Sequence, residues 1–484
     1  MESIECDVVV VGGGPAGSSA ATLLQRQGHK VVLFERERFP RDHVGESMLP
    51  FCHELFRDLG VLSKLETTFV RKPGVRFLHR DGHTSTSWCF EHVISDETYL
   101  SFHVDRSRFD KILLDNSREV GVDAREEHKV QAIDLSDPDS VTVEALGPDG
   151  ETTTVRARFV VDGSGRDAFI GTRKGTRKAR AELDRTAIWS HWTGVTMQGG
   201  LEEGLSIIIY VGEEQKGWIW IFPLTEDRIT AGTVMNNEYL REQKRTLEAA
   251  GSQDWQRDLM YQELRKATFA ATLLDAPGVV QALPTLVNGN YSYEVKDHYG
   301  PNYAMVGDAR GFIDPIFSSG VFLSIKTSFL VSEAINLKLR GDERAQTHFA
   351  DAYAKVTGAY DFVHRMIRLF YNPHAVTWAQ VGDEGPVHRA HESAMAAGHY
   401  MLSGGFFEDH QRFNRFFDLL EDPKGFHRYA KTVIAPRKTP EHTTCFTPHE
   451  IAFGNQTHWD GEVADDQGVS PRSEEVTAAP GRNV

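Results

Sequence analysis

The feature that most constrains the fold is a glycine-rich turn between an apolar strand and a helix, close to the start of the sequence. Residues 7–11 read Asp-Val-Val-Val-Val, a short β-branched run typical of a buried parallel strand. Residues 12–17 follow as Gly-Gly-Gly-Pro-Ala-Gly, which satisfies the spacing G-x-G-x-x-G. A helix is expected over residues 15–27 and a second buried strand over residues 30–35. The sequence therefore opens with a βαβ unit.

This context favours a dinucleotide site over an ordinary structural glycine turn, which is the alternative interpretation. Gly12 would allow the tight turn, Gly14 would let a pyrophosphate approach the backbone, and Gly17 would let the helix pack closely on the strand. The helix start would offer amide donors and a positive dipole end to the phosphates. Glu35 ends the second strand about 20 residues further on, where its carboxylate can accept from ribose hydroxyls. The predicted cofactor-binding residues of this unit are Gly12, Gly14, Pro15, Ala16, Gly17 and Glu35.

A second constellation indicates FAD rather than NAD. Asp308 lies in Val-Gly-Asp-Ala at residues 306–309, and Asp-Pro-Ile-Phe-Ser-Ser-Gly follows at residues 314–320, where a long helix is expected to begin. A carboxylate followed by a helix N-terminus is suited to hold a second ribityl or phosphate group and to stabilise negative charge on a reduced ring. Ser318 or Ser319 would also be a good N-cap, and the two interpretations are compatible.

Composition limits the remaining possibilities. The 484 residues suffice for two or three domains, and 40% hydrophobic with 25% charged residues is ordinary for a soluble globular protein. The net charge of -16 disfavours nucleic acid or an anionic membrane as the main partner. No uncharged apolar run reaches about 18 residues, so no membrane span is expected.

Cysteines and histidines give no sign of a metal centre. The four cysteines show no CxxC spacing: they are Cys6, Cys52, Cys89 and Cys445. We expect them to form neither a disulfide framework nor a zinc site, and we expect the protein to be cytoplasmic. His388 and His391 lie three residues apart, but no HExxH motif occurs, so no metal site is predicted.

Between the two nucleotide-type constellations the chain is mostly strand-like, and after the second it is mostly helical. Strands are expected at residues 75–79, 141–145, 159–162, 205–211, 218–223, 229–234 and 303–306, and helices at residues 108–118, 238–250, 255–271 and 321–339. The chain then reads as helical to about residue 432. The polar segment 459–484 is predicted to be disordered.

At these residues the sequence resembles the FAD-binding monooxygenase fold, the group that contains para-hydroxybenzoate hydroxylase. Three further segments resemble the flavin-dependent halogenases: Phe-Pro-Arg-Asp-His-Val-Gly-Glu-Ser at residues 39–47, Gly-Trp-Ile-Trp-Ile-Phe-Pro at residues 217–223, and the 314–320 segment. The resemblance runs from Asp7 to about Leu339. It is closest to the branch that halogenates phenol- or pyrrole-type natural-product intermediates, often carried on acyl or peptidyl carrier proteins.

The implied fold class is α/β: a GxGxxG Rossmann-type FAD-binding domain like that of para-hydroxybenzoate hydroxylase, a β-sheet substrate domain and a helical C-terminal region. The FAD-binding domain is expected to be discontinuous, over residues 1–75, 100–185 and 295–340. The substrate domain is expected over residues 76–99 and 186–294, the helical region over 341–458, and the disordered tail over 459–484.

The resemblance also implies roles for matching positions. It adds further FAD-binding residues to those of the glycine turn: Arg41, Ser47, Arg106, Asp308, Pro315 and Gly320. Halide would sit near the backbone amides of Ser319 and Gly320. Trp218 and Trp220 would separate the flavin from the substrate, and Lys72 would receive the oxidised halogen, so these three are the predicted catalytic residues.

The implied chemistry is that of a two-component enzyme. FADH2 from a separate flavin reductase would react with O2 to give a C4a-hydroperoxide, and chloride or bromide would attack it to give hypohalous acid. That small species would pass internally to Lys72, whose amine would hydrogen-bond it or form a chloramine. The acceptor would be an electron-rich aromatic small molecule, free or bound to an acyl or peptidyl carrier protein, in an antibiotic or other secondary-metabolite pathway.

Two departures and four alternatives accompany this hypothesis. Phe222 replaces the family's usual isoleucine, and Phe317 stands where tryptophan halogenases carry a catalytic glutamate, which argues against free tryptophan as substrate. Trp218 and Trp220 could simply pack in a core, and Lys72 could be a solvated loop residue. The whole chain could instead be a flavin-dependent aromatic monooxygenase or oxidoreductase on the same fold, or a flavoprotein without turnover.

Overall fold

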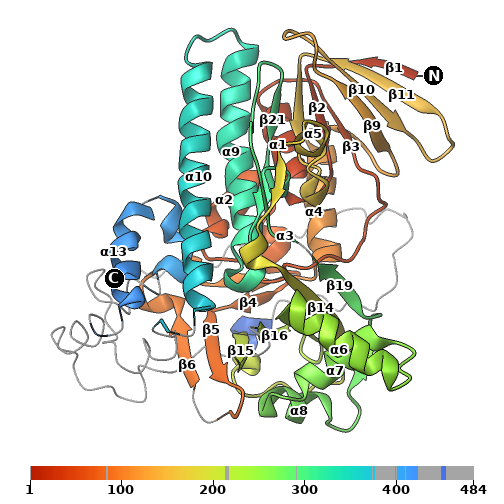
Figure 1. The fold of residues 1–484 in the computed structure, drawn as a ribbon. Helices are drawn as coiled ribbons and strands as arrows, with labels where there is room; N and C mark the ends of the chain where they lie inside the picture. Colours follow the sequence, from red (N-terminus) through yellow and green to blue (C-terminus); the bar gives the residue numbers. More distant parts are fainter. Residues whose placement is uncertain are drawn as a thin grey trace, which may run out of the picture.

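The computed structural model describes residues 2–82, 85–212, 217–289, 291–372, 374–375, 398, 400–408, 410–422, 424 and 449–453. In Figure 1 the parallel sheet and its helices form the upper part of the view, and the largest sheet forms the lower part. Two long helices, α9 (Ser319–Leu339) and α10 (Ala345–Phe370), run side by side along the molecule.

The upper part is built around a five-stranded parallel sheet that has the first strand of the βαβ unit at its centre. The strand order is β21-β12-β2-β3-β8, over Tyr303–Met305, Phe159–Asp162, Val8–Val11, Val31–Phe34 and Asp123–Arg125. All four residues of β2 are buried, because both faces of the sheet are covered. Val8 and Val10 pack toward the helices α1 (Pro15–Arg26), α4 (Arg106–Glu119) and α9.

The opposite face of this sheet is covered by a second sheet. Val9 and Val11 pack against a four-stranded sheet of order β1-β11-β10-β9. Its strands span Glu2–Glu5, Thr152–Ala157, Val141–Leu146 and Lys129–Asp134. The alternation of the valines between two apolar cores is what a run of consecutive β-branched residues predicts.

The lower part is an eight-stranded sheet of order β18-β14-β17-β16-β15-β5-β6, with β19 paired to β14. The strands span Val280–Gln281, Arg185–Thr193, Ile229–Asn236, Gly217–Pro223, Ser206–Gly212, Gly74–His79, Ser85–Cys89 and Leu286–Gly289. On β16, Ile219 and Ile221 pack against the layer of helices α6 (Asn237–Ala249), α7 (Trp255–Leu264) and α8 (Thr268–Leu274). Trp218 and Trp220 point to the other face, because side chains alternate along a strand.

Short elements join the two parts. The strand β4 (Val70–Lys72) pairs antiparallel with β7 (Ser101–His103), and α2 (Cys52–Leu59) and α3 (Leu62–Glu66) precede it. A small sheet is formed by β13 (Arg177–Ala179), β20 (Tyr293–Val295) and β22 (Gly311–Phe312), after α5 (Phe169–Arg173). The described helices beyond α10 are α13 (His410–Glu421) and α15 (His449–Phe453).

The structure confirms the α/β class and the strands and helices expected from the sequence up to α9, except that the helix expected over residues 255–271 is divided into α7 and α8. The sheet strands lie within the ranges predicted for the two main domains to within two residues, although the domain division itself stays a prediction. The predicted tail, 459–484, and the histidines at 388 and 391 lie outside the described residues. Among the described residues, α9 is long and apolar enough to cross a membrane by length and composition, and it packs between α1 and α10 with 67% of its apolar window buried.

The cysteine prediction is wrong at one position. Cys89, the last residue of β6, is disulfide-bonded, whereas Cys6 and Cys52 are free thiols. No local sequence pattern predicts this bond, because a single disulfide leaves no CxxC spacing.

Candidate active site

The main cavity has a volume of about 810 Å³ and is lined by residues of both large parts of the fold. Most of the predicted site residues line it: Gly12, Gly14, Pro15, Ala16, Glu35, Arg41, Ser47, Arg106, Trp218, Trp220, Asp308, Pro315 and Gly320. Its size is in the range of pockets that hold a cofactor. Residues from five separate segments of the sequence therefore meet at one site.

The glycine turn has the geometry that its sequence predicts. Gly12 has φ of +97°, and a Cβ on Gly17 would lie 1.9 Å from the carbonyl oxygen of Gly12, so neither position tolerates a side chain. A Cβ on Gly14 would meet only Nη2 of Arg41, at 3.5 Å. Gly14 is also the N-cap of α1 and provides no side-chain cap, so the helix start is open toward the cavity. That space and those amides fit a pyrophosphate.

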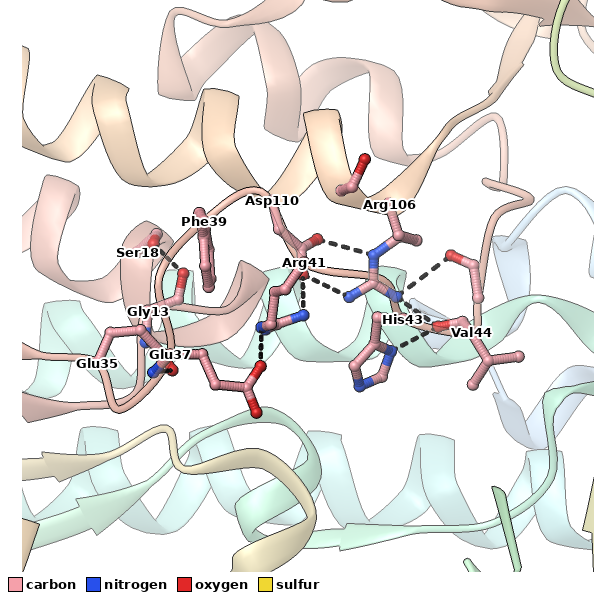
Figure 2. A network of polar contacts seen from close by, with 12 residues as sticks. Gly13, Ser18, Glu35, Glu37, Phe39, Arg41, His43, Val44, Arg106 and Asp110 are labelled. Carbon is pink, nitrogen blue, oxygen red and sulfur yellow. Dashed lines mark hydrogen bonds and ion pairs between the residues drawn. The ribbon is translucent and has the colours of Figure 1, made fainter. Parts of the chain in front are cut away.

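Glu35 is fixed at the end of β3 by two backbone amides. Its Oε2 accepts from the amide of Gly13 at 2.6 Å, and its Oε1 accepts from the amide of Glu37 at 2.9 Å. These bonds hold the carboxylate beside the glycine turn (Figure 2), where it can accept from a ribose hydroxyl.

A buried carboxylate joins the two predicted arginines. Asp110 on α4 accepts two hydrogen bonds from Arg106, at 2.7 and 2.9 Å, and forms an ion pair with Arg41 at 3.1 Å (Figure 2). Burial opposes ionisation of Asp110, but the Arg106 charge with its hydrogen bonds, together with Arg41, holds the pKa of this carboxyl below its ordinary value. Arg106 also donates to the carbonyl oxygen of Val44 at 2.6 Å, which ties the 39–47 segment to α4.

Two buried aspartates follow the strand β21. Asp308 lines the cavity, and burial raises its pKa to about 6 against the opposing charges of Arg106 and Arg166. Burial likewise raises the pKa of Asp314 to about 6, against the charge of Arg185. The open helix start, the carboxylates of Glu35 and Asp308 that line the cavity, and the two arginines together fit FAD.

The indoles of Trp218 and Trp220 form one wall of the cavity. Their rings lie 5.5 Å apart between centroids at an angle of 46°, and both side chains are almost fully buried. The Trp218 indole donates to the hydroxyl oxygen of Tyr371 at 2.8 Å, and that hydroxyl donates to Asp314 at 3.1 Å. The pair belongs to the hydrophobic core and also lines the cavity.

Lys72 is not a solvated loop residue. It ends β4, is 3% exposed and donates from Nζ to the carbonyl oxygen of Met48 at 3.0 Å, with Nζ 5.3 Å from the ring centre of Phe90. Burial lowers the pKa of its ammonium to about 7. Lys72 lines a second cavity, of about 20 Å³, among mostly apolar side chains that include Phe317.

The loop before α9 separates the two cavities. Ser318 lines both of them, has φ of 54° and makes no side-chain cap to the helix, so the serine N-cap interpretation is wrong for its hydroxyl. Gly320 lines the main cavity as predicted, whereas Ser319 is buried and Ser318 takes the lining position. Ser206 lines the Lys72 cavity and its hydroxyl is 3.2 Å from that of Ser47, which lines the main one.

Several residues of the site were missed by sequence reasoning. Glu46 lies in the 39–47 segment, and its partner His191 comes from β14, a strand that the sequence pattern does not predict. Tyr371, the C-cap residue that follows α10, contacts Trp218. No local pattern marks these contacts, since each depends on pairing between distant segments.

Comparison with known proteins agrees with this geometry. Residues 5–358 match the family of FAD binding domains, so the fold and site define an FAD-dependent flavoprotein. The flavin-dependent halogenase armH3 of Armillaria mellea is 31% identical over 375 residues, covering 74% of this chain and 72% of the relative. The chain belongs to the flavin-dependent halogenases.

Two further relatives extend the match along the chain. The 1H-pyrrole-2-carbonyl-[peptidyl-carrier protein] chlorinase of Pseudomonas fluorescens is 27% identical over 463 residues, covering 91% of this chain and 100% of the relative. The crystal structure of CmlS, a flavin-dependent halogenase, is 27% identical with a TM-score of 0.69, covering 92% of this chain and 76% of that structure. These likenesses favour a halogenase over the monooxygenase alternative.

Proposed function

We propose that this halogenase oxidises chloride or bromide at its FAD and delivers hypohalous acid to Lys72, which directs the halogen onto an electron-rich aromatic ring. The observation that carries the proposal is the placement of Lys72 in a small buried cavity that shares Ser318 with the flavin cavity. Reduced FAD supplied by a separate reductase would provide the electrons and activate O2. The chain's residues would then hold the halide, exclude the organic substrate from the flavin and position the oxidised halogen.

We propose that different residues of the main cavity bind the nucleotide half of FAD and the halide. The glycine turn, Glu35, Arg41 and Arg106 would hold the nucleotide half of FAD, and the open start of α9 at Ser319 and Gly320 would supply amides to a halide. Trp218 and Trp220 would stand between the ring system and the organic substrate. The bulky, buried indole pair would keep an aromatic molecule away from the flavin, whereas a small oxidant would pass.

The electrostatics of Lys72 suit the receiving role. Its pKa of about 7 keeps a substantial share of the side chain as neutral amine near neutral pH. A neutral amine can react with hypohalous acid to form a chloramine and water, whereas an ammonium can only hydrogen-bond the oxidant. The Met48 carbonyl fixes the direction of the Nζ atom.

The lining of the Lys72 cavity supports a substrate that is already electron-rich. Among its described lining residues no carboxylate is present, and Phe317, Phe77 and Phe90 supply apolar surface. A ring that needs a protein base for activation would find none there, whereas a phenol or a pyrrole is reactive by itself. We propose a phenol- or pyrrole-type intermediate, carried on an acyl or peptidyl carrier protein as the similar pyrrole chlorinase acts on a carrier-bound substrate. We propose the cytoplasm as the cellular location of this protein.

The decisive experiment supplies purified protein with FADH2, O2 and chloride or bromide, and offers phenols, pyrroles and tryptophan, free and carrier-bound. Halogenated mass shifts on a phenol or pyrrole support the proposal. Hydroxylated product without a halide requirement would remove it. Lys72→Ala should abolish substrate halogenation while FAD remains bound; if halogenation persists, the role of Lys72 is wrong.

A further inference from the structure

Glu46, which lines the main cavity together with Trp218 and Trp220, carries a buried carboxylate with one unpaired oxygen. Glu46 is 3% exposed and lines the cavity, and its Oε1 lies 2.6 Å from Nε2 of His191. Its Oε2 is buried and has no hydrogen-bond partner among the described residues. Leaving a buried carboxylate oxygen unpaired costs free energy, so a structural role alone does not account for it.

His191 is locked in one tautomer by an arginine. Nη2 of Arg228 lies 2.7 Å from Nδ1 of His191. A guanidinium has only donors and keeps its proton, so Nδ1 must be the acceptor and carry no hydrogen. The ring proton is then on Nε2 and is donated to Glu46. Arg228 also blocks the second protonation of the imidazole, because no lone pair on Nδ1 remains open.

This arrangement leaves one place for an exchangeable proton. His191 can neither gain a proton at Nδ1 nor release the Nε2 proton without becoming an anion. A proton that enters or leaves the pair is therefore carried by the carboxyl group of Glu46, whose Oε2 has no partner among the described residues. Arg106, the cation beside this segment, is already engaged by Asp110 and the Val44 carbonyl oxygen.

The strand of His191 connects this carboxyl to the sheet that carries the indoles. His191 on β14 pairs in register with Thr230 on β17, and Thr230 pairs with Phe222 on β16. The indole Nε1 of Trp220 is 3.4 Å from the hydroxyl oxygen of Thr230. Through His191, Glu46 is thus connected to the sheet face that carries Trp220.

We propose that Glu46 is the acid that supplies the proton consumed in making hypohalous acid, with His191 and Arg228 as its positioning residues. This inference rests on the proposed function. The balance is FADH2 + O2 + X⁻ + H⁺ → FAD + HOX + H2O, in which the halide loses two electrons, the oxygen–oxygen bond breaks, one oxygen joins the halogen and the other leaves as water. Without halide oxidation, FADH2 + O2 → FAD + H2O2 needs no added proton.

The variant Glu46→Gln distinguishes a role of Glu46 as proton donor from a purely structural role. The glutamine oxygen can still accept from His191, and the backbone bond from the Val104 amide to residue 46 is unaffected. We expect FAD affinity to stay within about twofold, hypohalous acid trapped by a small-molecule acceptor to fall about 100-fold, and H2O2 to appear in its place. Glu97→Gln, an exposed carboxylate elsewhere, should match the wild type in all three measurements. Wild-type hypohalous acid yield from Glu46→Gln would overturn the proposal.

The tautomer provides a test that does not depend on turnover. ¹⁵N NMR of histidine-labelled protein with oxidised FAD, with His191 assigned by difference from His191→Asn, should show protonated Nε2 and bare Nδ1 at neutral pH. Arg228→Met should add a proton at Nδ1, whereas Arg228→Lys, which keeps a donor, should not. A protonated Nδ1 in the wild type would overturn the inference. If the wild type makes no hypohalous acid at all, the proposed function fails as well, whereas equal yields from wild type and Glu46→Gln remove only the role of Glu46.

Discussion

The indole nitrogen of Trp218 lies 2.8 Å from the hydroxyl oxygen of Tyr371, so the C-cap residue of α10 holds one of the two indoles that line the main cavity. The same hydroxyl lies 3.1 Å from Oδ2 of Asp314 and donates to it. One phenol thus connects β16, α10 and the loop before α9. The helical part that follows the FAD-binding region takes part in the site through this contact.

Tyr371→Phe should therefore weaken both the fold and the wall. The change leaves the Trp218 N–H and an Asp314 oxygen short of a buried partner, which costs about 1–3 kcal/mol of unfolding free energy. Urea unfolding with FAD bound measures this. Tyr261→Phe, which removes a hydroxyl bonded to Gln281 outside the site, is the control and should cost less than about 1 kcal/mol. Equal effects of the two changes would contradict the bridging role.

The pKa of Lys72 predicts how the halogenation rate depends on pH. If the chloramine route operates, the rate should fall as pH drops through about 7, because the amine becomes protonated. The rate of hypohalous acid formation without an aromatic acceptor, measured with a small-molecule trap, should not fall in the same way as pH drops. A substrate halogenation rate that stays level below this pH would favour simple hydrogen bonding of the oxidant by an ammonium.

The burial of Lys72 should also lower the unfolding free energy of the protein, by an amount that depends on pH. The folded pKa is about 7 and the ordinary value is 10.5, so between them the unfolded chain binds the extra proton. The unfolding free energy should rise with pH across this window. Lys72→Met removes this destabilising contribution. Near neutral pH the variant should be more stable than the wild type by a few kcal/mol, since a difference of one pKa unit corresponds to roughly 1.4 kcal/mol. Urea unfolding at several pH values should show this difference shrinking as pH approaches 10; a difference independent of pH would refute it.

The network around Asp110 should matter more for cofactor binding than its neighbours on the same helix. Asp110→Asn removes the charge that holds Arg106 and Arg41, leaving two cations less well paired at the cavity, and we expect FAD affinity to fall at least tenfold with a loss of roughly 3 kcal/mol of stability. Asp115→Asn removes the half-exposed partner of Lys111 on α4 and should change either quantity little. Fluorescence titration with FAD and urea unfolding compare the two variants.

Local patterns predicted most of the framework, and long-range pairing accounts for what they missed. The run of valines predicted the buried strand β2, and the alternation of indoles and isoleucines predicted the strand β16 and its two faces. The structure also shows the steric reasons for glycine that were expected at Gly12 and Gly17. By contrast, Glu46 and His191 are 145 residues apart, and they meet only because β14 joins the large sheet in one register. The burial of Lys72 likewise depends on its tertiary surroundings, since its neighbours Arg71 and Pro73 gave no apolar pattern.

One added methyl group should prevent folding at Gly17 but should affect only FAD binding at Gly14. A Cβ on Gly17 would lie 1.9 Å from the Gly12 carbonyl oxygen and 3.3 Å from Val10, so Gly17→Ala forces helix and strand apart and should abolish folding or leave the protein insoluble. A Cβ on Gly14 meets only the movable end of Arg41 at 3.5 Å, so Gly14→Ala should fold with nearly unchanged stability. It would nevertheless occupy the space assigned to the pyrophosphate, and we expect FAD affinity to fall at least tenfold. Circular dichroism and FAD titration of Gly14→Ala separate folding from binding, and wild-type FAD affinity in that variant would show that the phosphates lie elsewhere.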